Sequence, residues 1–186
     1  MFIQTERTPN PATLKFLPGR TVSAADTVDF PDAESAERSP LASALFSLGD
    51  VTGVFFGADF IAVTKAEGSA DWSELKPQIL GIIMQHFTSG APLLHEGAEE
   101  AALADADDPA DEDIIVQIRE LLESRIRPAV ARDGGDIIYQ GFRNGVVYLR
   151  MQGACSGCPS STATLKNGIE SLLKHYVPEV TEVRAV

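Results

Sequence analysis

The chain has 186 residues, of which 44% are hydrophobic and 7% aromatic, and its formal net charge is −12. This length suits two small domains or one of medium size, and the composition is that of a globular protein with a buried core. The negative charge disfavours nucleic acid and anionic lipid as partners, and no apolar run approaches the roughly 20 residues that span a bilayer. We therefore expect a protein that uses neither nucleic acid nor a membrane as a partner.

The N-terminal sequence, MFIQTERTPNP, has no basic stretch followed by an apolar one and no Arg-rich amphipathic leader. Two cysteines are too few for a disulfide scaffold, and without a secretory leader they favour a reducing compartment. We expect a cytoplasmic protein of bacterial type.

The first 90 residues predict strands, a helix, a hairpin and a second helix, in that order. ATLKFLPG (12–19) and TVDF (27–30) have the composition of short strands. Ser39 and Pro40 are typical of a helix N-terminus. VTGVFF (51–56) and FIAVTK (60–65) flank a turn and predict a hairpin. An apolar stripe then predicts a helix, which Asp71 and Glu74 would cap: Leu75, Ile79, Ile82, Ile83 and Phe87.

Residues 91–111 are predicted to be a flexible acidic linker. Between Glu96 and Asp113 there are nine acidic residues and no Lys or Arg, so this stretch holds most of the net charge. It is rich in Ala and lacks aromatic residues, so it cannot bury enough surface to offset its conformational entropy. His86 and His95, which lie just before this stretch or at its start, are interpreted as surface residues.

Residues 112–186 predict a second small domain. An apolar stripe from Ile114 to Ile126 indicates a helix that stops at Pro128. IIYQGF (137–142) and VVYLR (146–150) flank Asn144-Gly145, which strongly favours a tight hairpin turn. Asp133-Gly134-Gly135-Asp136 is interpreted as a turn before this hairpin, with glycines at positive φ. A helix up to Tyr176 and a last short strand in VTEVRAV (180–186) complete an α+β fold of two small domains, 1–90 and 112–186.

The chemistry concentrates at Cys155 and Cys158, the only cysteines in the chain. A strand is expected to end near Met151 and a helix to begin at about Pro159, so both thiols would lie at a helix N-terminus. The helix dipole and free backbone N–H groups favour negative sulfur there, and we therefore expect a low thiol pKa. Gly153 and Gly157 would keep the loop open.

Three interpretations of the cysteine pair compete. A thiol–disulfide oxidoreductase of thioredoxin type also has C-x-x-C at a helix start, but here too little chain follows Cys158 to complete such a sheet. A structural zinc ion needs four ligands, and His175 would lie about 25 Å away along the helix at 1.5 Å per residue. An iron–sulfur cubane normally takes four thiolates, which two chains related by a two-fold axis would supply.

The motifs resemble a known family. GACSGCPSS followed by TLKNGI, and preceded by RPAVARDGGDI, resembles the C-terminal domain of NifU-like iron–sulfur cluster scaffold and carrier proteins. FIQTERTPNPATLKFLPG, ERSPLA and VFFGADFIAVTK are similar to the N-terminal domain of the Nfu subgroup. The resemblance covers nearly the whole chain except the acidic segment.

The resemblance implies a function and a site. Cys155 and Cys158 would bind a 4Fe–4S cluster shared between two subunits, in a homodimer or higher even oligomer. The protein would receive the cluster from upstream assembly machinery and deliver it to apo iron–sulfur proteins. It would be a carrier and not an enzyme.

Overall fold

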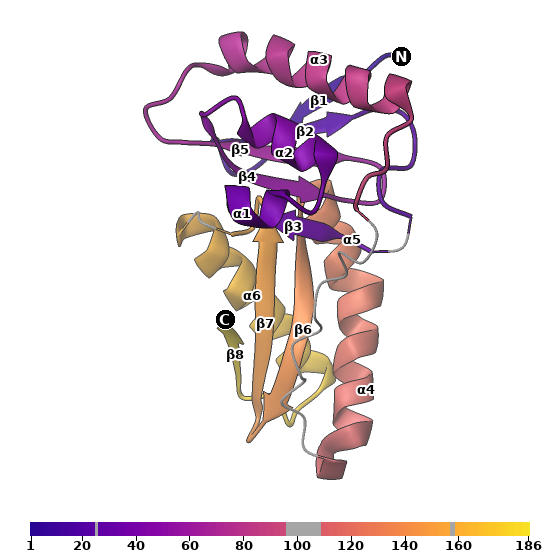
Figure 1. Ribbon diagram of the computed structural model, residues 1–186. Helices are drawn as coiled ribbons and strands as arrows, with labels where there is room; N and C mark the ends of the chain where they lie inside the picture. The colour runs from indigo at the N-terminus through magenta and orange to yellow at the C-terminus, as the bar shows by residue number, and fades with distance from the viewer. Residues whose placement is uncertain (25, 96–108, 157–158) are drawn as a thin grey trace. The chain divides into compact units, whose positions relative to one another are not determined.

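The computed structural model describes residues 1–24, 26–95, 109–156 and 159–186, and the chain divides into two compact units, Met1–Glu100 and Ala101–Val186 (Figure 1). We call them the N-terminal and the C-terminal unit. Both combine helices with one sheet, which confirms the predicted α+β class. The domain boundaries at 90 and 112 stay a prediction, and most of the predicted linker lies outside the described residues.

The N-terminal unit is an antiparallel five-stranded sheet with helices packed against it (Figure 1). The strand order is β1-β2-β5-β4-β3, so β1 and β3 are the edges. The strands are β1 (Gln4–Arg7), β2 (Thr13–Leu17), β3 (Val28–Phe30), β4 (Val51–Phe56) and β5 (Ile61–Lys65). The predicted hairpin at 51–65 is confirmed, because β4 and β5 pair antiparallel from Val51–Lys65 to Phe56–Ile61.

Three helices of the N-terminal unit share one core with this sheet. They are α1 (Ala33–Ala36), α2 (Pro40–Phe46) and α3 (Trp72–Ser89). Ser39 caps α2 by accepting a hydrogen bond from the Ala42 backbone N–H, with Pro40 at the first position as predicted. Asp71 is the N-cap residue of α3, yet its side chain makes no capping hydrogen bond, so the predicted capping pair with Glu74 does not form.

The C-terminal unit begins with a 3₁₀ turn, η1 (Pro109–Asp111), and a long helical segment: α4 (Glu112–Leu121), the π-helical turn η2 (Leu122–Ile126) and α5 (Arg127–Arg132). The prediction that the helix stops at Pro128 is wrong. Pro128 occupies the first turn of α5, and the wider hydrogen-bonding pattern of the π turn tolerates its missing N–H. The helical segment therefore continues to Arg132 and brings the chain to the sheet.

The sheet of the C-terminal unit has the order β6-β7-β8. β6 (Gly135–Arg143) and β7 (Val146–Gly153) form the predicted hairpin, with positive φ at Asn144 (52°) and Gly145 (78°). α6 (Pro159–Tyr176) then leads to β8 (Glu182–Ala185), which pairs parallel with β7. Ile118, Leu149, Leu173 and Val183 lie in one buried cluster, so α4, the sheet and α6 share a core.

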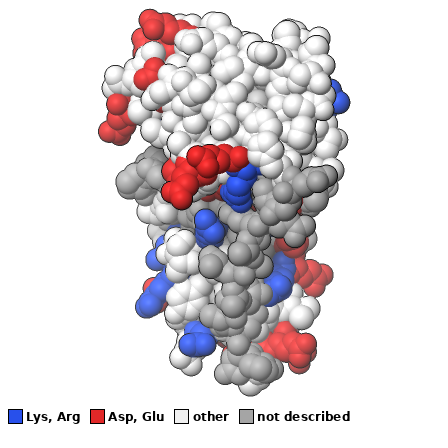
Figure 2. All heavy atoms as spheres, viewed as in Figure 1, with Lys and Arg blue, Asp and Glu red and all other residues white. Residues whose placement is uncertain are grey.

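The surface of the C-terminal unit carries both signs of charge. Figure 2 shows Lys and Arg side chains on the side of α6 and β8, and both acidic and basic side chains on the side of α4. Within the described ranges, no helix is long and apolar enough to cross a membrane.

Candidate functional site

Cys155 lies in the turn that follows β7, as the sequence predicted. The turn is held by backbone bonds: the Ala154 N–H donates to the Gly134 carbonyl at 3.2 Å, and the Ser156 N–H to the Gly153 carbonyl at 3.1 Å. Gly153 has a φ of 65°, a conformation that a residue with a side chain adopts only under strain. The turn is therefore built to place one thiol between the end of the sheet and α6.

Gly135, the first residue of β6, forms the wall against which the thiol packs. A Cβ atom at position 135 would lie 2.5 Å from the Cys155 Sγ and 2.7 Å from the Gln152 carbonyl oxygen. Real Cβ atoms do not approach other atoms so closely. The prediction of positive φ holds for Gly134, with a φ of 80°. Gly135 is needed for a different reason, namely the close approach of Cys155.

The thiol of Cys155 is buried. Only 6% of Cys155 is exposed, and it belongs to the hydrophobic cluster of the C-terminal unit. Burial raises the pKa of this thiol to about 12, and the negative charges of Asp133 and Asp136 add to the effect. The predicted low pKa is therefore wrong for Cys155, because desolvation outweighs the field of the helix N-terminus.

The second predicted ligand, Cys158, lies outside the described residues, and so does Gly157. On the described side of the gap, the Thr162 hydroxyl donates a hydrogen bond to the Cys155 carbonyl at 3.0 Å and so ties the first part of α6 to the turn. The structure thus places one of the two predicted ligands, together with a residue that anchors its backbone.

A salt bridge behind the turn was not predicted from the sequence. The Arg127 guanidinium donates to both carboxylate oxygens of Asp136, at 2.8 and 2.7 Å. Only 4% of the Asp136 side chain is exposed, and these bonds, followed by a weaker contribution from Glu123, raise the pKa of Arg127. Because Asp136 follows Gly135 directly, the pair joins α5 to the strand that carries the wall of the thiol site.

The histidines offer no additional ligand set. His95 and His175 are exposed, but His86 is 8% exposed and buried against the N-terminal core, so its interpretation as a surface residue is wrong. His86 continues the inward stripe of α3, which the apolar pattern had not included. In the part of the chain that the structure describes, no group of three or more His, Cys, Asp or Glu side chains is placed to hold a metal ion.

Comparison with protein families gives two matches. Residues 3–90 match the family described as scaffold protein Nfu/NifU N terminal, and residues 118–184 match the NifU-like domain. The order of these two domains and the thiol-bearing turn between β7 and α6 define the class as a NifU-like protein with an Nfu-type N-terminal domain.

Curated relatives narrow the class to a family. The chain is 51% identical to "NFU1 iron-sulfur cluster scaffold homolog, mitochondrial" of Homo sapiens and equally similar to that of Drosophila ananassae. All of this chain aligns, and it spans 72% of the human protein and 64% of the fly protein. The chain belongs to the Nfu family of iron–sulfur cluster scaffold homologues.

A solved structure is also similar. The solution structure of a NifU-like protein from Saccharomyces cerevisiae aligns with a TM-score of 0.46 at 22% identity, over 52% of this chain and 86% of that one. This likeness is too weak to carry an argument.

The expected localisation is wrong. The relatives at 51% identity are named mitochondrial, which contradicts a bacterial-type cytoplasmic protein.

Proposed function

We propose that the protein carries a 4Fe–4S cluster, bound by Cys155 and Cys158 of two subunits, and delivers it to apo iron–sulfur proteins. The cluster is cargo, received from upstream assembly machinery and passed on. The observation that carries the proposal is the donor set: a chain of the iron–sulfur scaffold family has two cysteines in all. A cubane normally takes four thiolates, so two chains supply a complete set around one two-fold axis.

The chemistry of the chain is ligand exchange without a change in oxidation state. Loading replaces the thiol proton of Cys155 by an iron bond and releases that proton. Delivery reverses the step: a thiolate of the recipient forms an Fe–S bond, the Cys155 bond breaks, and the sulfur takes up a proton. The chain itself contributes the position of each sulfur and the environment to which it returns.

The burial of Cys155 favours release of the cluster over its retention. The sulfur packs against Gly135, and Cys155 is 6% exposed, so we expect loading to move the turn 154–156 and make the sulfur accessible. After delivery the thiol returns to an apolar environment, which favours its neutral, protonated form. The cluster-free state is thereby stabilised relative to a state with an exposed thiolate, as a carrier requires.

The alternative prediction, a thiol–disulfide oxidoreductase, needs a nucleophilic thiolate. Burial raises the pKa of Cys155, which disfavours its thiolate when no partner is bound. The relatives of the chain are named for iron–sulfur cluster scaffolding, and we therefore propose a binding role and not a catalytic one.

The test is anaerobic reconstitution with iron and sulfide, followed by native mass spectrometry and Mössbauer spectroscopy. We expect one cubane per pair of chains, and dissociation of the pair when iron is chelated. Cys155→Ser and Cys158→Ser should each abolish stable cluster binding, whereas His95→Gln should leave it unchanged. A cubane on each isolated monomer would contradict the shared site. Insulin reduction without iron uptake would support the oxidoreductase instead.

A further inference from the structure

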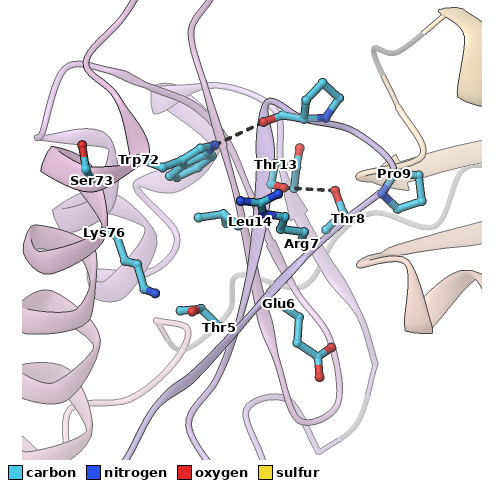
Figure 3. A pocket seen from close by; sticks show the side chains of 11 residues that line it. Thr5, Glu6, Arg7, Thr8, Pro9, Thr13, Leu14, Trp72, Ser73 and Lys76 are labelled. Carbon is cyan, nitrogen blue, oxygen red and sulfur yellow. Dashed lines mark hydrogen bonds between the residues drawn. The ribbon is translucent and has the colours of Figure 1, made fainter.

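The N-terminal unit contains a cavity that the cluster chemistry does not use. It lies between edge strand β1 and the first turns of α3, and its volume is about 490 Å³. This size falls within the roughly 300–1,000 Å³ of ligand-binding pockets. Figure 3 shows side chains from both elements around it. We call it the β1–α3 cavity, lined among others by Thr5, Arg7, Leu14, Trp72, Ser73 and Lys76.

One wall of the cavity is a fixed aromatic ring. The Trp72 indole N–H donates to the Pro11 carbonyl at 3.2 Å, which holds the ring at the N-terminus of α3 (Figure 3). Leu14, half-buried on β2, adds an apolar surface beside it. An indole that is held in place gives a large contact area at little cost in conformational entropy. This part of the cavity suits an apolar side chain.

The charged groups of the cavity are mostly cationic. In the described parts of the chain, neither Arg7 nor Lys76 forms an ion pair or a side-chain hydrogen bond. The one acidic lining residue, Glu6, has its carboxylate 3.7 Å from the Lys15 ammonium. Figure 3 shows Lys76 reaching from α3 toward β1, on which Arg7 lies. Two unneutralised cations around one cavity are complementary to carboxylates.

The third feature is the free edge of the sheet. β1 is an edge strand, paired with β2 on one side only among the described strands. Such an edge presents backbone N–H and C=O groups to which an extended peptide can pair. The cavity is immediately beside this edge, because Thr5 and Arg7 belong to β1 and line it.

We propose that the β1–α3 cavity and the outer edge of β1 bind a short acidic segment of a partner protein in extended conformation. Its backbone pairs with β1, one carboxylate lies between Arg7 and Lys76, and an apolar side chain packs on Trp72. A peptide fits these features better than a small anion, since a free carboxylate would use neither the strand edge nor the indole. The surface lies on the unit without cysteines.

The chain carries its own reporter for this test, because Trp72 is its only tryptophan. We would titrate the full chain with the peptide Ac-VEVEVE-NH₂ in about 0.15 M salt, which screens the overall negative charge of the protein. We expect a saturable change in Trp72 fluorescence. The matched peptide with Gln in place of Glu should bind at least tenfold more weakly. Backbone amide shifts in an NMR titration should map to β1 and the start of α3.

Charge-reversal variants locate the site. Arg7→Glu and Lys76→Glu should each weaken binding of the acidic peptide at least tenfold. Lys65→Glu, which makes the same change in net charge at a β5 residue that does not line the cavity, should alter it less than twofold. Circular dichroism confirms the fold of each variant, and cluster loading should be the same for all three.

Several results would overturn the proposal. One is the absence of a saturable response up to millimolar peptide, and another is an equal loss of binding with Lys65→Glu. Glutarate binding as tightly as the peptide would identify a small-anion site. Binding that occurs only after the acidic residues of 96–108 are replaced by Ala would show that the chain's own segment is the occupant.

Discussion

At the scale of single residues, the position of the Cys155 thiol depends on the missing side chain of Gly135. The space that a methyl group would fill at position 135 is occupied by the sulfur and by the Gln152 carbonyl. The glycine thus acts through its lack of volume, while Gly134 and Gly153 act through their positive φ.

Gly135→Ala should therefore displace the Cys155 turn. The added methyl group would meet the sulfur at 2.5 Å, and overpacking of this kind costs typically 1–3 kcal/mol. We expect a lower unfolding temperature and a substoichiometric cluster after reconstitution, measured as iron and sulfide per chain. Gly168→Ala is the control, because a Cβ in this part of α6 meets nothing within 4 Å. Wild-type cluster content and stability in Gly135→Ala would contradict the role of the contact.

His86 provides a pH-dependent contribution to the N-terminal unit. Burial lowers the pKa of this imidazole below its usual 6.5, so the unfolded chain binds the proton more readily than the folded one. The stability that the neutral His86 allows is complete above pH 6.5. It is lost as the pH falls below the pKa that His86 has in the unfolded chain, toward the lower pKa that it has in the folded one.

We expect the free energy of unfolding of the N-terminal unit to fall between pH 7.5 and pH 5.5, and to fall less in His86→Phe. Urea titrations at several pH values measure this difference. His95→Phe, at an exposed position, is the control for the substitution itself. An identical pH dependence in wild type and His86→Phe would show that His86 is not the source of the pH-dependent stability.

At the scale of elements, the Arg127–Asp136 pair connects the helical segment to the sheet. Arg127 begins α5, Asp136 is the second residue of β6, and the two side chains meet in a bidentate salt bridge. The pair holds the start of β6 against the helix. It thereby also positions Gly135, which precedes Asp136 in the strand.

Arg127→Leu should destabilise the C-terminal unit strongly. It leaves the buried Asp136 carboxylate without its two guanidinium hydrogen bonds, a loss of roughly 3–5 kcal/mol for a broken buried pair. Lys174→Ala breaks the pair with Glu170 near the surface and should cost far less. Denaturant unfolding measures both. A combined Arg127→Leu and Asp136→Leu variant should recover part of the loss, and a loss below 1 kcal/mol for Arg127→Leu would show that the pair is not structural.

The sequence predicted those structural elements that depend on residues close to one another in the chain. Asn144-Gly145 specified its turn because both residues tolerate positive φ, and Ser39-Pro40 specified the start of α2. The continuation of the helix past Pro128 was missed, because a proline usually ends a helix and the π turn before it has no local signal in the sequence. The position of Cys155 was predicted, but not its burial, since that depends on Gly135, twenty residues earlier in the chain. Long-range contacts leave no periodic trace in one sequence.

At the scale of the whole molecule, the two units have separate cores. The N-terminal cluster is formed by residues such as Phe16, Leu45 and Ile79, and the C-terminal cluster by residues such as Ile118 and Leu173. Each hydrophobic cluster contains residues of one unit only, and a core of this kind is the usual basis of independent folding.

Two core variants should therefore affect two different transitions. Ile79→Ala should lower the free energy of unfolding of the N-terminal unit only, and Ile118→Ala that of the C-terminal unit only. We expect a loss of about 2–5 kcal/mol in each case, because both side chains are fully buried. Calorimetry resolves the transitions, and NMR peak intensities assign them to the units. Cluster content should fall with Ile118→Ala alone. If either variant moved both transitions together, the units would not be independent.

The parallel strand β8 has a consequence for how the protein is made. Val183 is fully buried, and β8 pairs with β7, from which α6 separates it in the chain. During synthesis, the N-terminal unit has all of its strands and helices once Ser89 has left the ribosome. The sheet beside the Cys155 turn is complete only when β8, which ends at Ala185, has been synthesised. Translation therefore completes the N-terminal unit first, and the thiol site becomes able to reach its final form only after Ala185 has been made.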